Sequence, residues 1–418
     1  MGQKPRQLQP ALSAGHLFGA RLRQRRADAG LSQQKLGRLV HISGDLIGKI
    51  EKGERRANRD LARRCDSALG CAGALLQLWD RVEAEERGVR SPTGAIERET
   101  VLSCLPALRR VLDAYDLPDD GPAPTSDEVR RGVGRLVAMR LSSQYVGLAQ
   151  ELPETLQSYL RAYHSAVGQS RAELARHLTQ AFRAADAIAD KFGMYDLSAR
   201  IIGMIGQVAA ESGDEPTIAA AAYVRAEVFF ANQDWQVGRR MLEQAAAYLP
   251  SGDGPMAASY GALQMRAAVL AARAGRPDQA GEHIAEATAA AAARTAEGVY
   301  AGTAFGPDSV RIHHVTLAVD AGDPAEALRL AAGWVPPLHV PPERRSHFFV
   351  DLADAQVRCG RHEEALTTLQ TARRVAPQHV RYHPQVQATV RTLVQQATVS
   401  SALGELSRWT GVASGIRA

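Results

Sequence analysis

One stretch constrains the fold of this chain more than any other: residues 30–56, GLSQQKLGRLVHISGDLIGKIEKGERR. Apolar residues recur in both halves of this stretch at the i, i+3 and i+4 spacings of an α-helix. They are Leu36 and Val40 in the first half, then Leu46, Ile47 and Ile50 in the second. The pattern predicts two short amphipathic helices with a tight break between them.

Capping residues mark where the two helices begin and end. Ser32 and Ser43 stand at the start of the two apolar runs, where a hydroxyl accepts from the unpaired amides of the first turn. Gly53 follows the second run and predicts its end. Two helices joined by three or four residues form a helix-turn-helix, which places its second helix in the major groove of DNA.

The stretch resembles the Cro/lambda-repressor-like (XRE-type) DNA-binding fold. The resemblance rests on LSQQKL (31–36), on the run I-x-K-I-E-K-G-E (47–54), and on the apolar spacing. The chain departs from the family at the turn, where His41 replaces the usual glycine, and in the second helix, which contains Gly44 and Gly48. Each helical glycine costs about 1 kcal/mol against alanine and offers no side chain to read a base.

The resemblance implies which residues face DNA. Gln33 matches the family's phosphate-contacting glutamine, and Asp45 is placed to accept from cytosine N4. Basic residues after the second helix are expected at phosphates, where contacts position a protein without reading sequence. The expected DNA contacts are Ser32, Gln33, Ser43, Gly44, Asp45, Lys49, Lys52, Arg55 and Arg56.

The same family resemblance implies an ion pair between Arg26 and Glu51. Glu51 follows Ile47 and Ile50 on the second helix and should face the core in part, so its carboxylate needs a partner. A guanidinium offers that carboxylate two parallel donors.

Charge is unevenly distributed along the chain. Residues 1–80 contain 15 Lys and Arg against 7 Asp and Glu, whereas the remaining residues contain 35 against 38. A basic head and a slightly acidic body fit a DNA-binding domain attached to a domain with another role. We expect a flexible arm at 1–15, the helix-turn-helix domain at 16–86, a linker at 87–96, and a helical sensor and dimerisation domain at 97–415.

The body has helical patterns that come in pairs, and strand signals are absent. Tetratricopeptide repeats place small residues twelve apart where two helices cross, then a large apolar residue, an alanine and a proline at fixed spacings. The spacing occurs at Ala226, Gly238, Leu242, Ala245 and Pro250, and again at Ala353, Ala365, Leu369, Ala372 and Pro377. We predict an all-α fold: a five-helix lambda-repressor-like domain, then an α-solenoid of degenerate tetratricopeptide-like pairs. An irregular alanine-rich bundle is the alternative.

The whole chain resembles a set of actinobacterial-type regulators with an XRE-type head and a degenerate repeat body. The segments YVGLAQELPETLQSYL (145–160) and GRHEEALTTLQTARRVAPQHVRYHPQV (360–386) carry the body's part of that resemblance. A superhelical body offers a groove lined by the first helix of each pair, suited to a small molecule, a peptide or a protein. The groove candidates are Tyr223, Glu227, Phe230, Met265, Ile312, Thr316, His347 and Asp354.

Other chemistry finds little support in the sequence. His379 and His383 are four apart, but Pro384 disfavours helix at His383. We therefore predict hydrogen-bonded or solvated histidines, no metal site and no cofactor.

The four cysteines show no zinc spacing, and Cys65 is expected to be a buried hydrophobe. Nucleophile-elbow, P-loop and dinucleotide fingerprints are absent, so we predict no enzyme activity.

These observations predict a cytoplasmic, sequence-specific transcriptional regulator without a membrane segment. One helix-turn-helix contacts few base pairs, so a homodimer on a two-fold DNA site is expected, modulated through the body. A peptide-pheromone sensor of the same layout is one alternative. An adaptor or scaffold whose head has lost DNA specificity is another.

Overall fold

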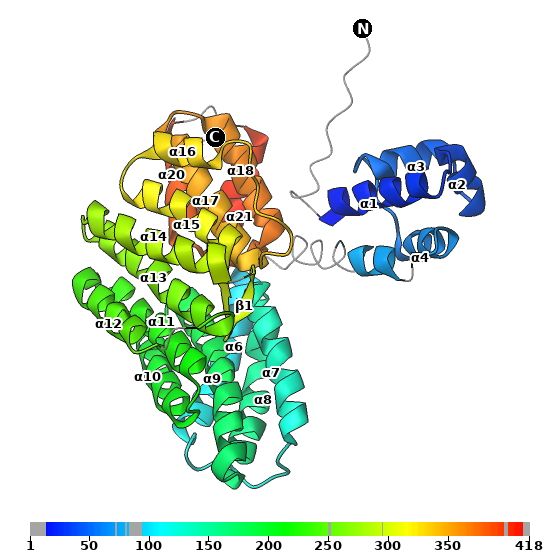
Figure 1. Ribbon diagram of the computed structural model, residues 1–418. Helices are drawn as coiled ribbons and strands as arrows, with labels where there is room; N and C mark the ends of the chain where they lie inside the picture. Colours follow the sequence, from blue (N-terminus) through cyan, green and yellow to red (C-terminus); the bar gives the residue numbers. More distant parts are fainter. Residues whose placement is uncertain are drawn as a thin grey trace. The chain divides into compact units, whose positions relative to one another are not determined.

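The computed structural model describes residues 14–71, 73–79, 82, 94–249, 252–294, 296–396 and 400–412. The chain divides into two compact units, Met1–Ser91 and Pro92–Ala418, which we call the head and the body (Figure 1). The predicted arm lies outside the described residues except at its end, where the first helix has begun. Of the predicted linker, 87–93 lies outside them, and the last three residues are already helical.

The head is built from short helices, as the sequence predicts. Its elements are α1 (Ala14–Asp28), α2 (Gln33–Leu39), α3 (Gly44–Glu51), α4 (Arg59–Ala68) and a helical segment at 74–79. Of the fifth helix, expected from Ala72 to Glu85, residues 72, 80, 81 and 83–85 lie outside the described part of the chain. The apolar positions of the motif form the core with Leu22, because Leu36, Val40, Ile47 and Ile50 are all buried.

Both predicted caps of the helix-turn-helix are confirmed. Ser32 Oγ accepts from the Lys35 amide at 3.1 Å, and Ser43 Oγ accepts from the Leu46 amide at 3.2 Å. Between the helices, His41 takes a φ of 57°. That left-handed conformation explains why a glycine is usual at this turn, and here a histidine adopts it instead.

Helices make up nearly all of the body, and consecutive helices pack against each other along it (Figure 1). Its first six are α6 (Gly94–Asp113), α7 (Ser126–Leu141), α8 (Tyr145–Ser165), α9 (Gly168–Lys191), α10 (Tyr195–Glu211) and α11 (Glu215–Asn232). Next come α12 (Trp235–Ala247), α13 (Pro255–Arg273), α14 (Pro277–Arg294), α15 (Pro307–Asp320) and α16 (Pro324–Ala331). The last are α17 (Pro342–Arg358), α18 (His362–Val375), α19 (Pro377–Tyr382), α20 (Pro384–Gln396) and α21 (Ser401–Thr410). None of the helices in the described ranges is long and apolar enough to cross a bilayer.

The small residues of the repeat pattern lie where paired helices meet. In the pair α17–α18, Ala353, Ala365, Leu369 and Ala372 are all fully buried, and Pro377 begins the next helix. In the pair α11–α12, a Cβ on Gly238 would meet Phe229 at 2.8 Å, so the close crossing needs a glycine. Tetratricopeptide-like pairing is therefore the architecture of this region.

A short β-hairpin interrupts the helices, and the prediction that strands are absent is wrong here. Strands β1 (Gly298–Tyr300) and β2 (Thr303–Phe305) pair antiparallel around a turn at Ala301 and Gly302, whose φ values are 42° and 74°. The strands are three residues long and their turn lacks the Asn-Gly or Asp-Gly signal, so local sequence gives no warning. Packing holds the hairpin instead: Phe305 is fully buried against Gly261, where any Cβ would collide with its ring.

The end of the body returns to its beginning. Arg381 on α19 forms a buried ion pair with Glu97 on α6, and Tyr382 Oη donates to the same carboxylate at 3.1 Å. Gln378 Oε1 accepts from the Val146 amide at 3.0 Å. These contacts tie the last helices to the first ones, so the interior of the body is enclosed by elements from both ends of it.

Candidate functional site

Helix α3 presents a charged face to solvent. Asp45 and Lys49 are exposed on that face and pair with each other at 2.8 Å, whereas Ile47 and Ile50 are buried on the opposite side. The hydrogen bond and charge of Lys49 lower the pKa of the Asp45 carboxyl. An exposed pair of this kind contributes little stability, so a phosphate or base edge can replace it.

The two glycines of α3 are packing positions, which corrects the expectation that they remove base-reading side chains. A Cβ on Gly44 would lie 2.8 Å from the Cα of Gln34, and one on Gly48 would lie 3.1 Å from Gln33 Oε1. Gly48 is buried and faces α2. The glycines let α2 and α3 approach closely, so a larger residue at either position would face the head's interior rather than DNA.

The predicted ion pair between Arg26 and Glu51 is confirmed. Arg26 Nε and Nη2 donate to the two carboxylate oxygens at 2.5 and 2.9 Å, and Glu51 is 1% exposed. Arg26 Nη1 also donates to the Leu31 carbonyl at 2.7 Å. The hydrogen bonds that the Arg26 guanidinium donates to Glu51 raise the pKa of that guanidinium. The pair ties α1 to α3 and to the start of α2.

Gln33 takes part in the same network. Its Nε2 donates to Glu51 Oε2 at 2.8 Å, so one end of this side chain is held inside the head. The phosphate contact implied for Gln33 stays a prediction, since it needs this amide to turn outward. Ser32 and Ser43 are exposed at the two helix starts beside it.

The basic residues after α3 divide into two kinds. Lys52 and Arg55 are exposed next to α3 and available to phosphates. Arg56 is exposed too, but its Nη2 donates to the Val82 carbonyl at 3.3 Å and so joins the head's own packing. Of the three, Lys52 and Arg55 therefore fit the expected phosphate contacts best.

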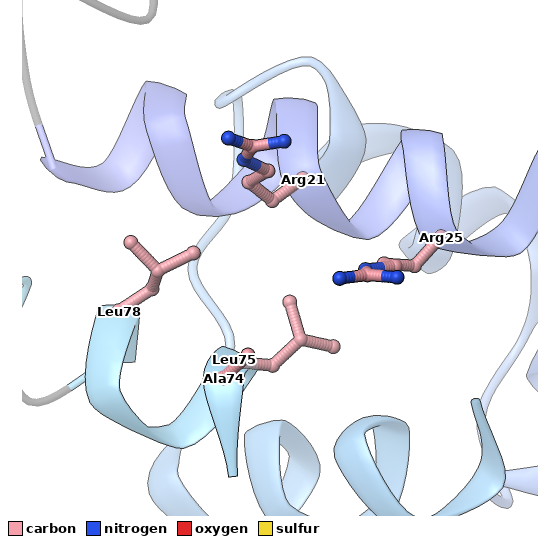
Figure 2. Close-up of a pocket in the computed structure, with 5 residues that line it drawn as sticks. All are labelled: Arg21, Arg25, Ala74, Leu75 and Leu78. Carbon is pink, nitrogen blue, oxygen red and sulfur yellow. The ribbon is translucent and has the colours of Figure 1, made fainter. Parts of the chain in front are cut away.

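A shallow hollow lies on the head between α1 and the helical segment 74–79. Figure 2 shows Arg21 and Arg25 of α1 facing Leu75 and Leu78 across it. It has room for about 250 Å³, with Ala74 also in its wall. Arg21 Nη1 is turned to Gln24 at 2.8 Å.

The interior of the body contains a cluster of charged side chains from five helices. We call this set the interior polar cluster: Arg140, Arg183, Tyr223, Glu227, Arg266 and Arg344. Arg266 Nη2 donates to Glu227 at 3.0 Å and its guanidinium lies 4.3 Å from the centre of the Tyr223 ring. Arg344 Nη2 donates to the Tyr223 hydroxyl at 3.3 Å.

The hairpin turn enters this cluster. Arg183 Nη1 donates to the Ala301 carbonyl at 2.5 Å and its Nη2 to Thr303 Oγ1 at 3.0 Å, while Gln180 Nε2 reaches the same Ala301 carbonyl at 2.9 Å. Arg140 donates to the Gly302 carbonyl. The buried Arg183 and the half-buried Arg140 thus bind main-chain carbonyls of the chain's own turn.

The excess of buried arginine changes the acidity of its neighbours. Burial works to raise the pKa of Tyr223, but the charges of Arg344 and Arg266 outweigh it and bring the pKa down to about 8. Burial, and next the charge of Arg140, lower the pKa of Arg183. The interior is therefore electropositive around Tyr223.

The groove candidates from the sequence meet different surroundings. Tyr223 and Glu227 belong to the interior polar cluster, and Phe230 stacks under Arg266 and Arg273 at 5.1 and 5.0 Å. Met265 and Ile312 are fully buried core residues instead. Two further candidates are engaged within the body: Thr316 Oγ1 donates to Asp351 at 2.6 Å, and Asp354 pairs with Arg358 at 2.8 Å.

His347, the last groove candidate, lies beside two other histidines. One ring nitrogen from each of His347, His379 and His383 lies within 4.8 Å of the other two. His383 is not helical, as Pro384 predicts, yet it turns back beside His379 at the end of α19. The sequence does not predict this grouping, because His347 on α17 is far along the chain from His379 and His383.

Several interior residues escaped the sequence analysis altogether. Arg140 and Arg183 bind carbonyls 162 and 118 residues further along the chain, so no local pattern marks them.

Asp66 in the head is another residue that the sequence did not predict. It is buried and accepts from the Gly73 and Leu75 amides at 2.7 and 2.8 Å, capping the segment 74–79. A helix cap with so long a spacing has no sequence signal.

Comparison with known proteins supports the assignment of the head. Residues 17–79 match a family model described as a helix-turn-helix domain. No curated protein matches the sequence significantly. Among solved structures, the chain is similar to Bacillus thuringiensis PlcR in complex with the peptide PapR7 and DNA, at 10% identity and a TM-score of 0.25. That match covers 65% of this chain and 93% of the other, and at this TM-score it carries no argument about function.

Proposed function

We propose that this protein is a sequence-specific transcriptional regulator of the XRE type, with the layout of the actinobacterial-type regulators. It acts in the cytoplasm, binds DNA as a homodimer, and has no enzymatic activity. The observation that carries the proposal is helix α3, whose Asp45 and Lys49 face solvent on a capped helix-turn-helix, in a head rich in basic residues. Ser43, Gly44 and Lys52 flank that face, and Arg55 adds charge where phosphates run.

The test replaces the base-reading cation. Selection from random duplex DNA with the full chain should return a two-fold symmetric site, as two copies of one head require. Lys49→Ala should then weaken binding to that site by about 1–3 kcal/mol and relax the preference at one position of each half-site. Titration of labelled duplexes with every single-base change measures both effects.

The control is Arg63→Ala, which removes the same charge from α4. Arg63 is exposed and pairs only with Asp60 of its own helix among the contacts of the described residues. Its loss should weaken binding to all duplexes alike and leave base preference intact. Equal base preference in wild type and Lys49→Ala would contradict the proposed role of α3. Binding without any sequence preference would instead favour the adaptor.

We also propose that head and body are separable domains. The segment 87–93 contains Gly, Ser and Pro. Segments of this composition are cut readily by proteases where they make few contacts. Brief protease digestion of the full chain should cut there first and leave two resistant fragments. The head fragment should still bind DNA, weakly and with strong salt dependence. A first cut inside either fragment would contradict the division.

The body is proposed to modulate DNA binding through a ligand. The interior polar cluster supports a ligand with main-chain carbonyls or a carboxylate, because its arginines already donate to the carbonyls of the turn at Ala301 and Gly302. This contact is what favours the second candidate, a peptide-sensing regulator, over a purely small-molecule one. A peptide that raises or lowers operator affinity of the full chain, but not of the head fragment, would support it.

A further inference from the structure

We propose that His347, His379 and His383 form a binding site for a divalent transition-metal ion of the Zn²⁺ class. The site lies in the body and does not depend on the proposed DNA binding. Three imidazoles are a ligand set that Zn²⁺, Co²⁺, Ni²⁺ and Cu²⁺ share, and a three-histidine site leaves one position open for water or another ligand.

The hydrogen bonds of Ser346 fix which nitrogen of His379 is free. The Ser346 hydroxyl donates to the Glu343 carbonyl at 2.6 Å, so its oxygen can only accept from His379 Nδ1, which lies 2.8 Å away. His379 Nδ1 therefore carries the proton, and Nε2 carries the lone pair. That Nε2 is fully buried and has no hydrogen-bond partner among the residues that the structure describes.

A second nitrogen is in the same state. His383 Nδ1 is buried and has no hydrogen-bond partner either. Burying a polar atom without a hydrogen-bond partner costs stability, so two such atoms in one group of histidines call for an explanation. A metal ion supplies it, because it accepts both lone pairs at once.

The geometry needs only a small contraction to close around an ion. The ring centres lie 4.6 Å apart for His347 and His379, 5.5 Å for His347 and His383, and 5.1 Å for His379 and His383. With metal–nitrogen bonds of about 2.0–2.1 Å, tetrahedral ligand nitrogens are about 3.3 Å apart. The present nitrogens are within 4.8 Å. His347 can supply part of the movement, since its side chain is 30% exposed.

The surroundings also resemble the outer shell of a metal site. Glu343 Oε1 lies 3.2 Å from His347 Nε2, as a carboxylate does when it orients a ligating histidine. Two cations act on the group. The charge of Lys191 lowers the pKa of His379 and His383, and that of Arg273 lowers the pKa of His383, but Lys191 is paired with Asp190 at 3.0 Å and Arg273 with Asp320 at 3.2 Å. Burial keeps the pKa of both histidines well below the usual value, so each ring is neutral and able to ligate.

The experiment measures metal binding by the full chain without an affinity tag, after removal of bound metal with a chelator. Co²⁺ titration followed by visible absorption should show one saturable site per chain, with the intense bands of a four- or five-coordinate ion, and Zn²⁺ should displace it. His347→Ala and His383→Ala should each weaken Co²⁺ binding at least tenfold. Ser346→Ala should weaken it by about 10–100-fold through loss of the hydrogen bond that orients His379.

The matched control is His314→Ala, which removes a half-buried histidine on α15 outside the group. It should bind Co²⁺ as wild type does. Far-ultraviolet circular dichroism checks that each variant is folded, and His347→Ala carries the test if the more buried variants fail it. Zn²⁺ should also raise the melting temperature of wild type and not that of His347→Ala. Absence of saturable binding in wild type, or unchanged binding in His347→Ala, would overturn the proposal.

Discussion

The head and the body differ in how many charged side chains they bury. In the head, the cations that could meet a ligand lie on the surface, as Lys49, Lys52 and Arg55 do. In the body, several charged side chains are buried, among them Arg183, Asp186, Asp351 and Arg381. Net charge therefore misleads: the nearly neutral body holds a strong internal field, whereas the basic head directs its field outward, where a polyanion can reach it.

The strongest test of this contrast is the buried pair of Arg26 and Glu51, which with Asp66 is an exception within the head. Arg26→Met alone should lower the free energy of unfolding by roughly 3–5 kcal/mol, because a carboxylate that is 1% exposed would lose its partner. Arg26→Met combined with Glu51→Leu should cost less than the single change. Urea denaturation of the fragment 1–91 measures both. Small and additive effects would mean that the pair behaves like a surface pair.

The next prediction concerns the electrostatic field of the arginines inside the body. The pKa of Tyr223 measures that field. Its pKa of about 8 lies below the usual value near 10. The stability it provides is fully present above pH 10 and is lost as pH falls through 8, so between these values the group makes the fold more stable as pH rises. Near-ultraviolet absorption should show one tyrosine ionising near pH 8, and Tyr223→Phe should abolish that step.

Two features make this titration clean. All ten tyrosines lie in the body, so tyrosine absorption reports on that unit alone. Burial raises the pKa of Tyr145 to about 12, so its ionisation does not overlap the step near pH 8. Arg344→Met should move the step toward higher pH. A full-length protein with no tyrosine ionising below pH 9 would show that the interior arginines do not create the field described above.

The smallest expected effect compares one glycine from each unit. Gly44→Ala should destabilise the head by about 1–3 kcal/mol, because the new Cβ would lie 2.8 Å from backbone of Gln34. Gly134→Ala on α7 should instead stabilise the body by about 0.5–1 kcal/mol, since nothing lies within 4 Å of its added Cβ. Thermal unfolding of both variants measures the difference. A neutral Gly44→Ala would mean that α2 and α3 can separate slightly at no cost.

What the sequence could predict was local or family-shared. Ser32 and Ser43 act within three residues of themselves, and the alanines of α17 and α18 follow a fixed repeat, so these were recognisable. Arg26 and Glu51 are far apart but lie in a motif with a known register. The hairpin at 298–305, the interior arginines and the meeting of His347 with His379 depend on distant contacts that no spacing encodes.

The hairpin has a consequence for how the body unfolds. A solenoid whose repeats touch only their neighbours can fray from either end, and its melting need not be a single step. Here the turn at Ala301 and Gly302 is bound by arginines 118 and 162 residues earlier, which couples repeats that are remote in sequence. Removing these hydrogen bonds to the turn, for example with Arg183→Met, should split one cooperative unfolding transition into two. The repeats of the body would then unfold independently of one another rather than in a single cooperative transition.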